Sequence, residues 1–452
     1  MAALLAGLLI VVLPRRKAFV PFLAAALLIS TDQVLVLGGV HFPMLRVLIV
    51  FGAVRILRSK PRSTTEIFSG GINAIDIALL LFAGFTALDG ILLWQERAAV
   101  IYQIGNLYST LGAYILLRFL IRDHEDVKLA IRTLAYVAMV AAAIMICEHL
   151  TGRNPYYATF GGAMSDVYSS VSLREDHIRA TGFFAHPILA GTFGGIIFPL
   201  FVGLWWNSRR DRKLALIGAV SAATMGFAAS SSTALFGMAG GILGLFMWPL
   251  RRHMRIIRWS IAIVIVSLHL VMKAPVWHLI SRVDLSGGSS SYHRYQLVNE
   301  CILHFKDWFL IGTKQYASWG WDMWDLSNQY VGTADTVGII PLLSFIGIIV
   351  FGFRYLGKAR KAASKDRKQE LFVWAVGASL FANVVAFWGI GYFDQTVVAW
   401  YAIVAMISAA SFHVSQSSRM VPESRIVASP IDEGQQYTYE GVQMNDKCHD
   451  RA

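Results

Sequence analysis

The stretch HPILAGTFGGIIFPLFVGLWWNSRRDRK, residues 186–213, decides the fold class of this chain. Residues 186–206 are almost all apolar, and basic side chains crowd residues 207–213. As a helix, an apolar run of about 20 residues crosses a hydrocarbon core about 30 Å thick. Short basic loops mark the cytoplasmic side of a membrane. The stretch therefore predicts a transmembrane helix whose C-terminal end lies at the cytoplasmic face.

The same alternation of apolar runs and short basic gaps extends over most of the chain. Its 452 residues are 56% hydrophobic and 15% charged, with a mean hydropathy of +0.54, which excludes an ordinary soluble protein. We therefore predict an all-α fold, a polytopic transmembrane helical bundle with about 11–13 spans. The candidate spans are 2–13, 18–36, 41–57, 72–93, 99–121, 128–149, 186–206, 214–230, 232–250, 259–275, 330–353, 371–389 and 394–413.

The net charge of +12 is spread over short gaps between apolar runs. Topology signals that are attracted to anionic lipid have this placement, so we expect a lipid bilayer and no nucleic acid as partner. The cysteines Cys147, Cys301 and Cys448 show no paired spacing, which predicts neither a disulfide framework nor a metal site.

The basic gaps leave two longer loops, 150–185 and 276–329, on the outer side of the membrane. Both are rich in Trp, Tyr, His and Gly, which favours a functional role over disorder. Residues 1–413 form the predicted membrane domain. The polar tail, 414–452, is expected to be a disordered cytoplasmic extension.

The segment RATG, residues 179–182, closes the first outer loop and leads into the helix of the opening stretch. An arginine and free N–H groups at a helix N-terminus bind phosphate oxygens. Gly182 allows the close turn that such a site needs, whereas Gly191 and Gly195 allow tight helix packing. An interfacial anchor is the alternative role for Arg179.

The second outer loop carries Arg282 and Arg294 on the same side of the membrane as Arg179. Arg294 begins a segment whose apolar residues form one helical stripe, which predicts an amphipathic helix over the membrane surface. Tryptophans of this loop suit either an interfacial belt or sugar stacking. The residues of the stripe are Leu297, Val298, Cys301, Ile302 and Phe305.

Polar groups also gather near the predicted outer ends of spans: the cluster 230–233, Asp335, and Asp394 with Gln395. An acidic side chain inside a membrane helix costs about 2.5–3.5 kcal/mol on insertion scales, so it usually faces a cavity or a partner. These groups predict a polar site at the outer face. Bonding between neighbouring helices is an equal alternative for the serine cluster.

The order of these features resembles the O-antigen ligase and Wzy-type O-antigen and exopolysaccharide polymerase superfamily. The resemblance covers residues 60–410 by layout. It implies a GT-C-like fold in the bacterial inner membrane with an active site that faces the periplasm. The matching pieces are RATGFFAHPILAG (179–191), SSSTALFG (230–237), SSSYHRYQLVNECILHFKDWFLIG (289–312) and DLSNQYVGTADTVG (325–338).

The resemblance implies a glycosyltransferase that polymerises undecaprenyl-diphosphate-linked oligosaccharide repeats without a metal or other cofactor. A hydroxyl of the glycan or lipid acceptor attacks the anomeric carbon, and arginines stabilise the departing lipid diphosphate. The catalytic residues implied are Arg179, Arg294, Asp335 and Asp394. The substrate-binding residues implied are Arg282, Gly182, His186, His293, Asn328, Gln329 and Tyr330.

One position departs from the superfamily pattern. Its ligases carry H-N-x-Y where this chain has Ser327-Asn328-Gln329-Tyr330. Serine does not accept a proton at neutral pH as imidazole does, so the base must come from elsewhere. The candidates are Asp335, Asp394, His293 and His186.

The missing histidine favours a polymerase over a ligase that transfers the glycan to lipid A core or a protein hydroxyl. A transporter of lipid-linked oligosaccharides is a third alternative. It is less favoured because the sequence shows no internal repeat and gathers its polar residues at one face.

Overall fold

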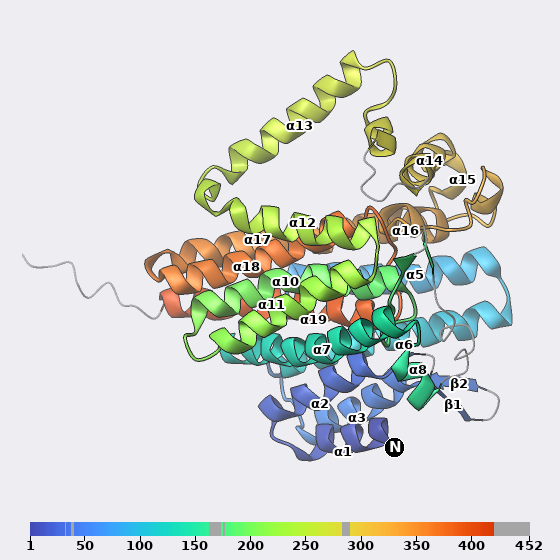
Figure 1. Ribbon diagram of the computed structural model, residues 1–452. Helices are drawn as coiled ribbons and strands as arrows, with labels where there is room; N and C mark the ends of the chain where they lie inside the picture. The colour runs from blue at the N-terminus through green and yellow to red at the C-terminus, as the bar shows by residue number, and fades with distance from the viewer. Residues whose placement is uncertain (32, 38–39, 162–172, 175–176, 283–289, 420–452) are drawn as a thin grey trace, which may run out of the picture.

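The computed structural model describes residues 1–452 except 32, 38–39, 162–172, 175–176, 283–289 and 420–452. Helices make up most of the described chain, which confirms the all-α prediction, and Figure 1 shows most of the long ones side by side in one bundle. The elements in chain order are α1 Ala2–Val12, α2 Arg15–Leu28, β1 Val34–Leu37, β2 Val40–Pro43, α3 Met44–Arg58, α4 Thr64–Ile67, α5 Ala74–Trp94, α6 Arg97–Leu120, α7 His124–Thr151, α8 Pro155–Phe160, β3 Leu173–Arg174, β4 His177–Ile178, α10 Pro187–Asn207, α11 Arg212–Ala228, α12 Ser232–Phe246, η1 Trp248–Leu250, α13 Met254–Val271, η2 Val276–Arg282, α14 Ser290–Leu303, α15 Phe305–Trp308, η3 Tyr316–Ser318, α16 Gln329–Val337, α17 Ile339–Ala362, η4 Ala363–Lys365, α18 Arg367–Ala386 and α19 Gln395–Arg419.

Within the described chain, six helices are long and apolar enough to cross a membrane: α5, α7, α10, α13, α17 and α18. Three shorter apolar helices accompany them, namely α1, α12 and the first part of α19, Gln395–Ser411. The architecture is therefore that of a helical membrane protein.

Two predicted spans are interrupted. The span predicted over 18–36 ends at Leu28, because the polar residues after α2 stop the helix and β1 then pairs antiparallel with β2. The span predicted over 330–353 is divided at Gly338, whose φ of +85° is left-handed. A Cβ there would lie 2.5 Å from the carbonyl oxygen of Leu310, so only glycine fits the break.

The C-terminal boundary also differs from the prediction. Helix α19 continues to Arg419, so residues 414–419 belong to a helix and not to the polar tail. Residues 420–452, the rest of the predicted tail, lie outside the described residues.

Helix α10 lies at the centre of the bundle, where it packs against α7, α11, α12, α18 and α19. Its glycines make this possible. A Cβ on Gly191 would lie 2.6 Å from the Cβ atoms of both Ala229 and Ala234. A Cβ on Gly195 would lie 2.9 Å from the main-chain nitrogen of Met238. The prediction that these two glycines permit close helix packing is confirmed.

Helix α13 has the opposite surroundings. Figure 1 shows it projecting away from the bundle, and none of its residues is buried. Its apolar side chains, Ile261 and Val266 among them, are exposed on every side.

Replacing Gly195 with alanine is expected to destabilise the protein by about 1–3 kcal/mol, because the new methyl group would press on the main chain of α12. Thermal unfolding of the purified protein in detergent measures this effect. Gly84→Ala on α5 is the matched control. Apart from the nearby backbone of α5 itself, no described atom lies within 4 Å of its added Cβ, and alanine favours a helix over glycine by about 1 kcal/mol. Equal melting temperatures for the two variants would contradict the packing argument.

Candidate functional site

The RATG turn is held by the carboxylate of Glu148, near the C-terminal end of α7. Glu148 accepts hydrogen bonds from the main-chain N–H groups of Thr181 (3.0 Å) and Gly182 (2.8 Å) and from the Thr181 hydroxyl (3.0 Å). The amide of Asn154 donates to Glu148 (3.1 Å) and to the carbonyl of Gly182 (2.7 Å). Gly182 has a left-handed φ of +63°. A buried anion thus fixes the turn directly after Arg179.

A second clamp reaches the same turn from the start of α19. The carboxylate of Asp394 accepts hydrogen bonds from the main-chain N–H of Ala185 (2.8 Å) and from the hydroxyl of Thr31. The amide of Gln395 donates to the carbonyl of Phe183 (2.9 Å). Burial raises the pKa of the Asp394 carboxyl, while the hydrogen bonds from Thr31 and Ala185 lower it. In this arrangement Asp394 positions the turn.

His186 caps the N-terminus of α10 through its ring. Its Nδ1 accepts the N–H of Ile188 (3.2 Å). Burial, and then the positive charge of the nearby Arg179, lower the pKa of His186 to about 4. The imidazole is therefore neutral at pH 7, and its proton lies on Nε2 because Nδ1 is an acceptor. Such a ring donates a hydrogen bond to a ligand, so it suits substrate binding better than base catalysis.

The connection between α11 and α12 holds both neighbours of Arg179. The N–H of Ala180 donates to the carbonyl of Ala228 (3.0 Å), and the hydroxyl of Ser230 donates to the carbonyl of Ile178 (3.4 Å). Atoms Nε and Nη2 of Arg179 are shielded from solvent. Arg179 as a whole is half-buried, so its guanidinium lies partly within the protein wall.

Arg294, on α14, reaches the same connection from the second loop. Its Nη2 donates to the hydroxyl of Thr233 (2.8 Å), which donates in turn to the carbonyl of Gly389 (3.1 Å). The fold thus brings Arg179 and Arg294, which are far apart in the sequence, to the two ends of one short connection. The predicted polar cluster 230–233 supplies the contacts on both sides.

A pocket of about 300 Å³ lies between residues 324–332 and 390–393, adjacent to Gly389. Asn328 and Gln329 line it, and each also has a structural role. The side-chain oxygen of Asn328 caps α16, and that of Gln329 accepts the main-chain N–H of Tyr392 (2.6 Å).

Tyr330 follows these two residues in α16 but turns toward α18. Its hydroxyl donates to the carbonyl of Val384 (3.3 Å), and its ring packs against Phe345 and Trp388. Tyr330 therefore does not line the pocket, whereas Asn328 and Gln329 do. Its contact with a substrate stays a prediction.

Asp325 is the carboxylate among the residues that line this pocket. Although its side chain reaches solvent, desolvation by the surrounding protein raises its pKa. Asp322 raises the pKa further, and the charges of His293 and Arg294 lower it. A carboxylate with a raised pKa beside a pocket suits proton transfer.

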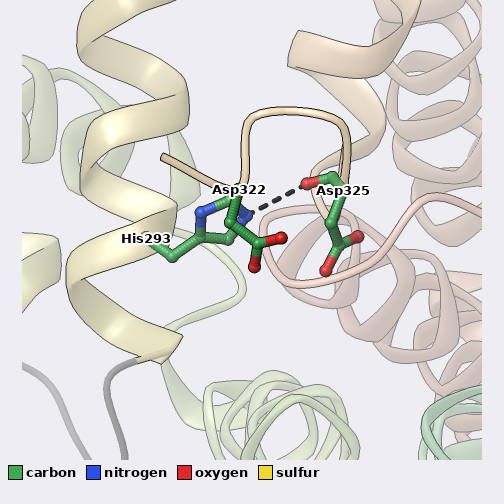
Figure 2. Close-up of side chains that lie close together, drawn as sticks. All are labelled: His293, Asp322 and Asp325. Carbon is green, nitrogen blue, oxygen red and sulfur yellow. Dashed lines mark hydrogen bonds between the residues drawn. The ribbon is translucent and has the colours of Figure 1, made fainter. Parts of the chain in front are cut away.

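Figure 2 shows His293 pointing toward the loop that carries Asp322 and Asp325. One potential ligand atom from each residue lies within 4.8 Å of the others, a spacing that could hold a metal ion. Nε2 of His293 already makes a hydrogen bond with the main-chain oxygen of Asp325 (3.0 Å). A metal ion bound at Nε2 would have to replace that bond, whereas Nδ1 is buried and meets no partner among the described residues. The absence of a metal therefore stays a prediction of the sequence.

Asp335 lies apart from the pocket. It is fully buried beside the thiol of Cys301, under α14. Both carboxylate oxygens of Asp335 are buried and accept no hydrogen bond among the described residues, and burial raises the pKa of the neighbouring thiol. The catalytic role predicted for Asp335 would require this cluster to open.

Two other predictions fall on the second loop. The stripe beginning at Arg294 forms α14, with Leu297, Val298 and Cys301 buried. Phe305 starts the separate helix α15 and is exposed, as is Ile302. Arg282 ends η2 with an exposed side chain, and the described chain shows no contact between it and the connection from α11 to α12.

Sequence reasoning missed Glu148, Asn154 and Asp325. Glu148 is a lone acid near the end of a predicted span, so the cost of burying a carboxylate in a membrane helix would have singled it out. Asp325 begins one of the quoted pieces of the resemblance, two residues before Ser327. Asn154 gives no comparable signal.

No family model matches this chain, and no curated protein matches it. The function of the site is therefore inferred from its geometry and from the resemblance of its sequence motifs.

We expect Glu148→Gln to lower the free energy of unfolding by about 1–3 kcal/mol, because an amide nitrogen would face groups that themselves donate hydrogen bonds. Thermal unfolding in detergent is the measurement. The matched control is Glu125→Gln on the same helix, an exposed residue paired with Lys128. A Glu148→Gln variant as stable as the control would rule out the anchoring role.

Proposed function

We propose that this chain is a GT-C-like membrane glycosyltransferase that polymerises undecaprenyl-diphosphate-linked oligosaccharide repeats at the periplasmic face of a bacterial inner membrane. The observation that carries the proposal is the placement of Arg179 and Arg294 at the two ends of the connection between α11 and α12. Two arginines beside one short connection suit a diphosphate, whose oxygens accept paired N–H donors.

The surroundings of Arg179 support the donor end of this site. The turn that follows it is fixed from two sides, by Glu148 and by Asp394 with Gln395. Fixed cationic groups stabilise a developing negative charge better than mobile ones, because they need no reorganisation during the reaction. The neutral His186 adds a hydrogen-bond donor without adding charge.

The pocket beside residues 324–332 and 390–393 supports the acceptor end. In the proposed reaction an acceptor hydroxyl bonds to the anomeric carbon while the bond from that carbon to the diphosphate oxygen breaks. The hydroxyl proton passes to a base, and the diphosphate leaves with both bonding electrons. Asp325 lines the pocket and lies near Arg294, so it is our candidate for that base. In this proposal Asp325 takes the role of base that the histidine of the H-N-x-Y pattern would have at position 327.

The test is transfer by purified protein in nanodiscs supplied with the undecaprenyl-diphosphate oligosaccharide alone, with products sized by gel and mass spectrometry. We expect a ladder of lengthening lipid-linked chains. Transfer that occurs only after addition of lipid A core or a protein acceptor would indicate a ligase. No transfer with any acceptor would reject the glycosyltransferase.

In this assay Arg179→Ala and Arg294→Ala are each expected to slow chain growth by about 10²–10³-fold, because each removes a donor to the leaving diphosphate. Arg153→Ala is the matched control, since this exposed arginine lies in the same outer loop as Arg179. A ladder that forms equally fast in all three variants would contradict the proposal that Arg179 and Arg294 bind the diphosphate.

We also expect full activity in the presence of excess EDTA, because the proposed charge stabilisation rests on arginines. The control adds Mg²⁺ back after chelation. Activity that is lost with EDTA and restored by Mg²⁺ would contradict this expectation. Loss of that restoration in His293→Ala would then place the ion at the cluster of His293, Asp322 and Asp325.

A further inference from the structure

A second pocket, of about 480 Å³, lies at the other end of the bundle from the candidate site. It is next to the start of α2 and α7, whose opposite ends approach the RATG turn through Thr31 and Glu148. Four arginines from three separate parts of the chain surround it. The lining residues are Val11, Val12, Leu13, Arg15, Arg55, Arg58, Ser59, Glu66, Phe119 and Arg122.

Main-chain carbonyl groups hold Arg55 in this pocket. Its Nη1 donates to the carbonyls of Ile10 and Leu13, both at 2.6 Å, at the end of α1. Its Nε is buried and meets no acceptor among the described residues. Carbonyl groups orient a guanidinium but bring no negative charge, so the charge of Arg55 stays uncompensated.

Arg15 and Arg122 are held at the junction of α6 and α7. Arg15 donates to the carboxylate of Asp126 and to the carbonyl of Leu120, both at 2.6 Å. Arg122 donates to the carbonyl of Thr65 (2.9 Å). Burial, and then the charge of Arg15, lower the pKa of Arg122. The arginines therefore repel one another.

The carboxylates near the pocket do not balance these charges. Asp126 is shared, because it accepts from the Arg122 main chain (3.0 Å) and also lies 3.5 Å from Arg16. Glu66 is the one acid that lines the pocket, and it accepts the main-chain N–H of Arg62 (2.8 Å). Four guanidinium groups thus face the carboxylates of Asp126 and Glu66, which leaves an excess of positive charge in a concave site.

We propose that this pocket binds the phosphate headgroup of an anionic lipid. Guanidinium groups bind phosphate oxygens through paired N–H donors, and the excess positive charge requires an anion. An apolar surface continues from the pocket. Val12 and Leu57 are 69% and 74% exposed on α1 and α3, beside the arginines, and acyl chains can lie against them. A free phosphate ion would use the arginines but not this surface.

The experiment is a titration of the purified full chain in detergent with phosphatidic acid, followed by native mass spectrometry. We expect a retained lipid adduct whose affinity is at least tenfold higher than that of phosphatidylcholine, whose choline group cancels the phosphate charge. Inorganic phosphate is titrated in parallel as competitor. Equal affinities for the two lipids would overturn the proposal. Displacement of phosphatidic acid by millimolar inorganic phosphate would reassign the pocket to a free ion.

The double variant Arg58→Gln/Arg122→Gln is expected to weaken phosphatidic acid binding at least tenfold. Arg62→Gln is the control, because it removes one arginine charge from an exposed residue that does not line the pocket. If the double variant fails to fold, Arg58→Gln alone carries the test, since Arg58 is exposed, with about threefold weakening expected. Equal binding by the pocket variant and the control would refute the site.

Discussion

The bundle depends on how closely other helices approach α10. Gly194 faces α11, Gly195 faces α12 and Gly203 faces α18, and a Cβ at each would lie within 3 Å of an atom of that helix. Association of apolar helices in a bilayer gains little from burial, because lipid chains are as apolar as the side chains. Contact between backbones then supplies van der Waals attraction instead. A central helix with larger side chains on these faces would separate its neighbours.

The position of α10 also determines where the candidate site forms. Its N-terminus lies at one end of the bundle core, and the turn before it carries Arg179 and His186. The turn is too polar to be held by apolar packing. It is held by Glu148 and by Asp394 with Gln395, which come from α7 and from the start of α19. Two helices far apart in the sequence therefore fix one short segment, which explains how a loop residue is positioned as precisely as a helical one.

Apolar periodicity predicted the helical class and most of the helices, because span length and basic gaps are local properties of the sequence. It failed where local polarity or one backbone angle decides the outcome. The break at Gly338 arises from a left-handed φ and from the close carbonyl of Leu310. A hydropathy pattern predicts neither feature. The hairpin of β1 and β2 likewise follows a short polar stretch inside an otherwise apolar run.

The candidate site was predictable in part for a related reason. Arginines and acids in an apolar chain are conspicuous, so Arg179, Arg294 and Asp394 could be selected one by one. Their partners depend on tertiary structure. The sequence does not reveal that Asp394 is engaged by the N–H of Ala185, or that Asp335 lies beneath α14. The carboxylate that lines the pocket, Asp325, was overlooked because the nearby Ser327 drew the comparison with a histidine motif.

Helix α13 shows how differently two apolar helices can constrain their sequences. Every position of α10 that meets a neighbouring backbone admits few residues, since volume and shape are both specified. Helix α13 buries none of its residues, so exchanging one apolar side chain for another creates neither a cavity nor a clash. Its sequence is therefore free to drift among apolar residues over evolutionary time. Of these two apolar helices, α10 is constrained by the shape of its neighbours, whereas α13 is constrained only to remain apolar.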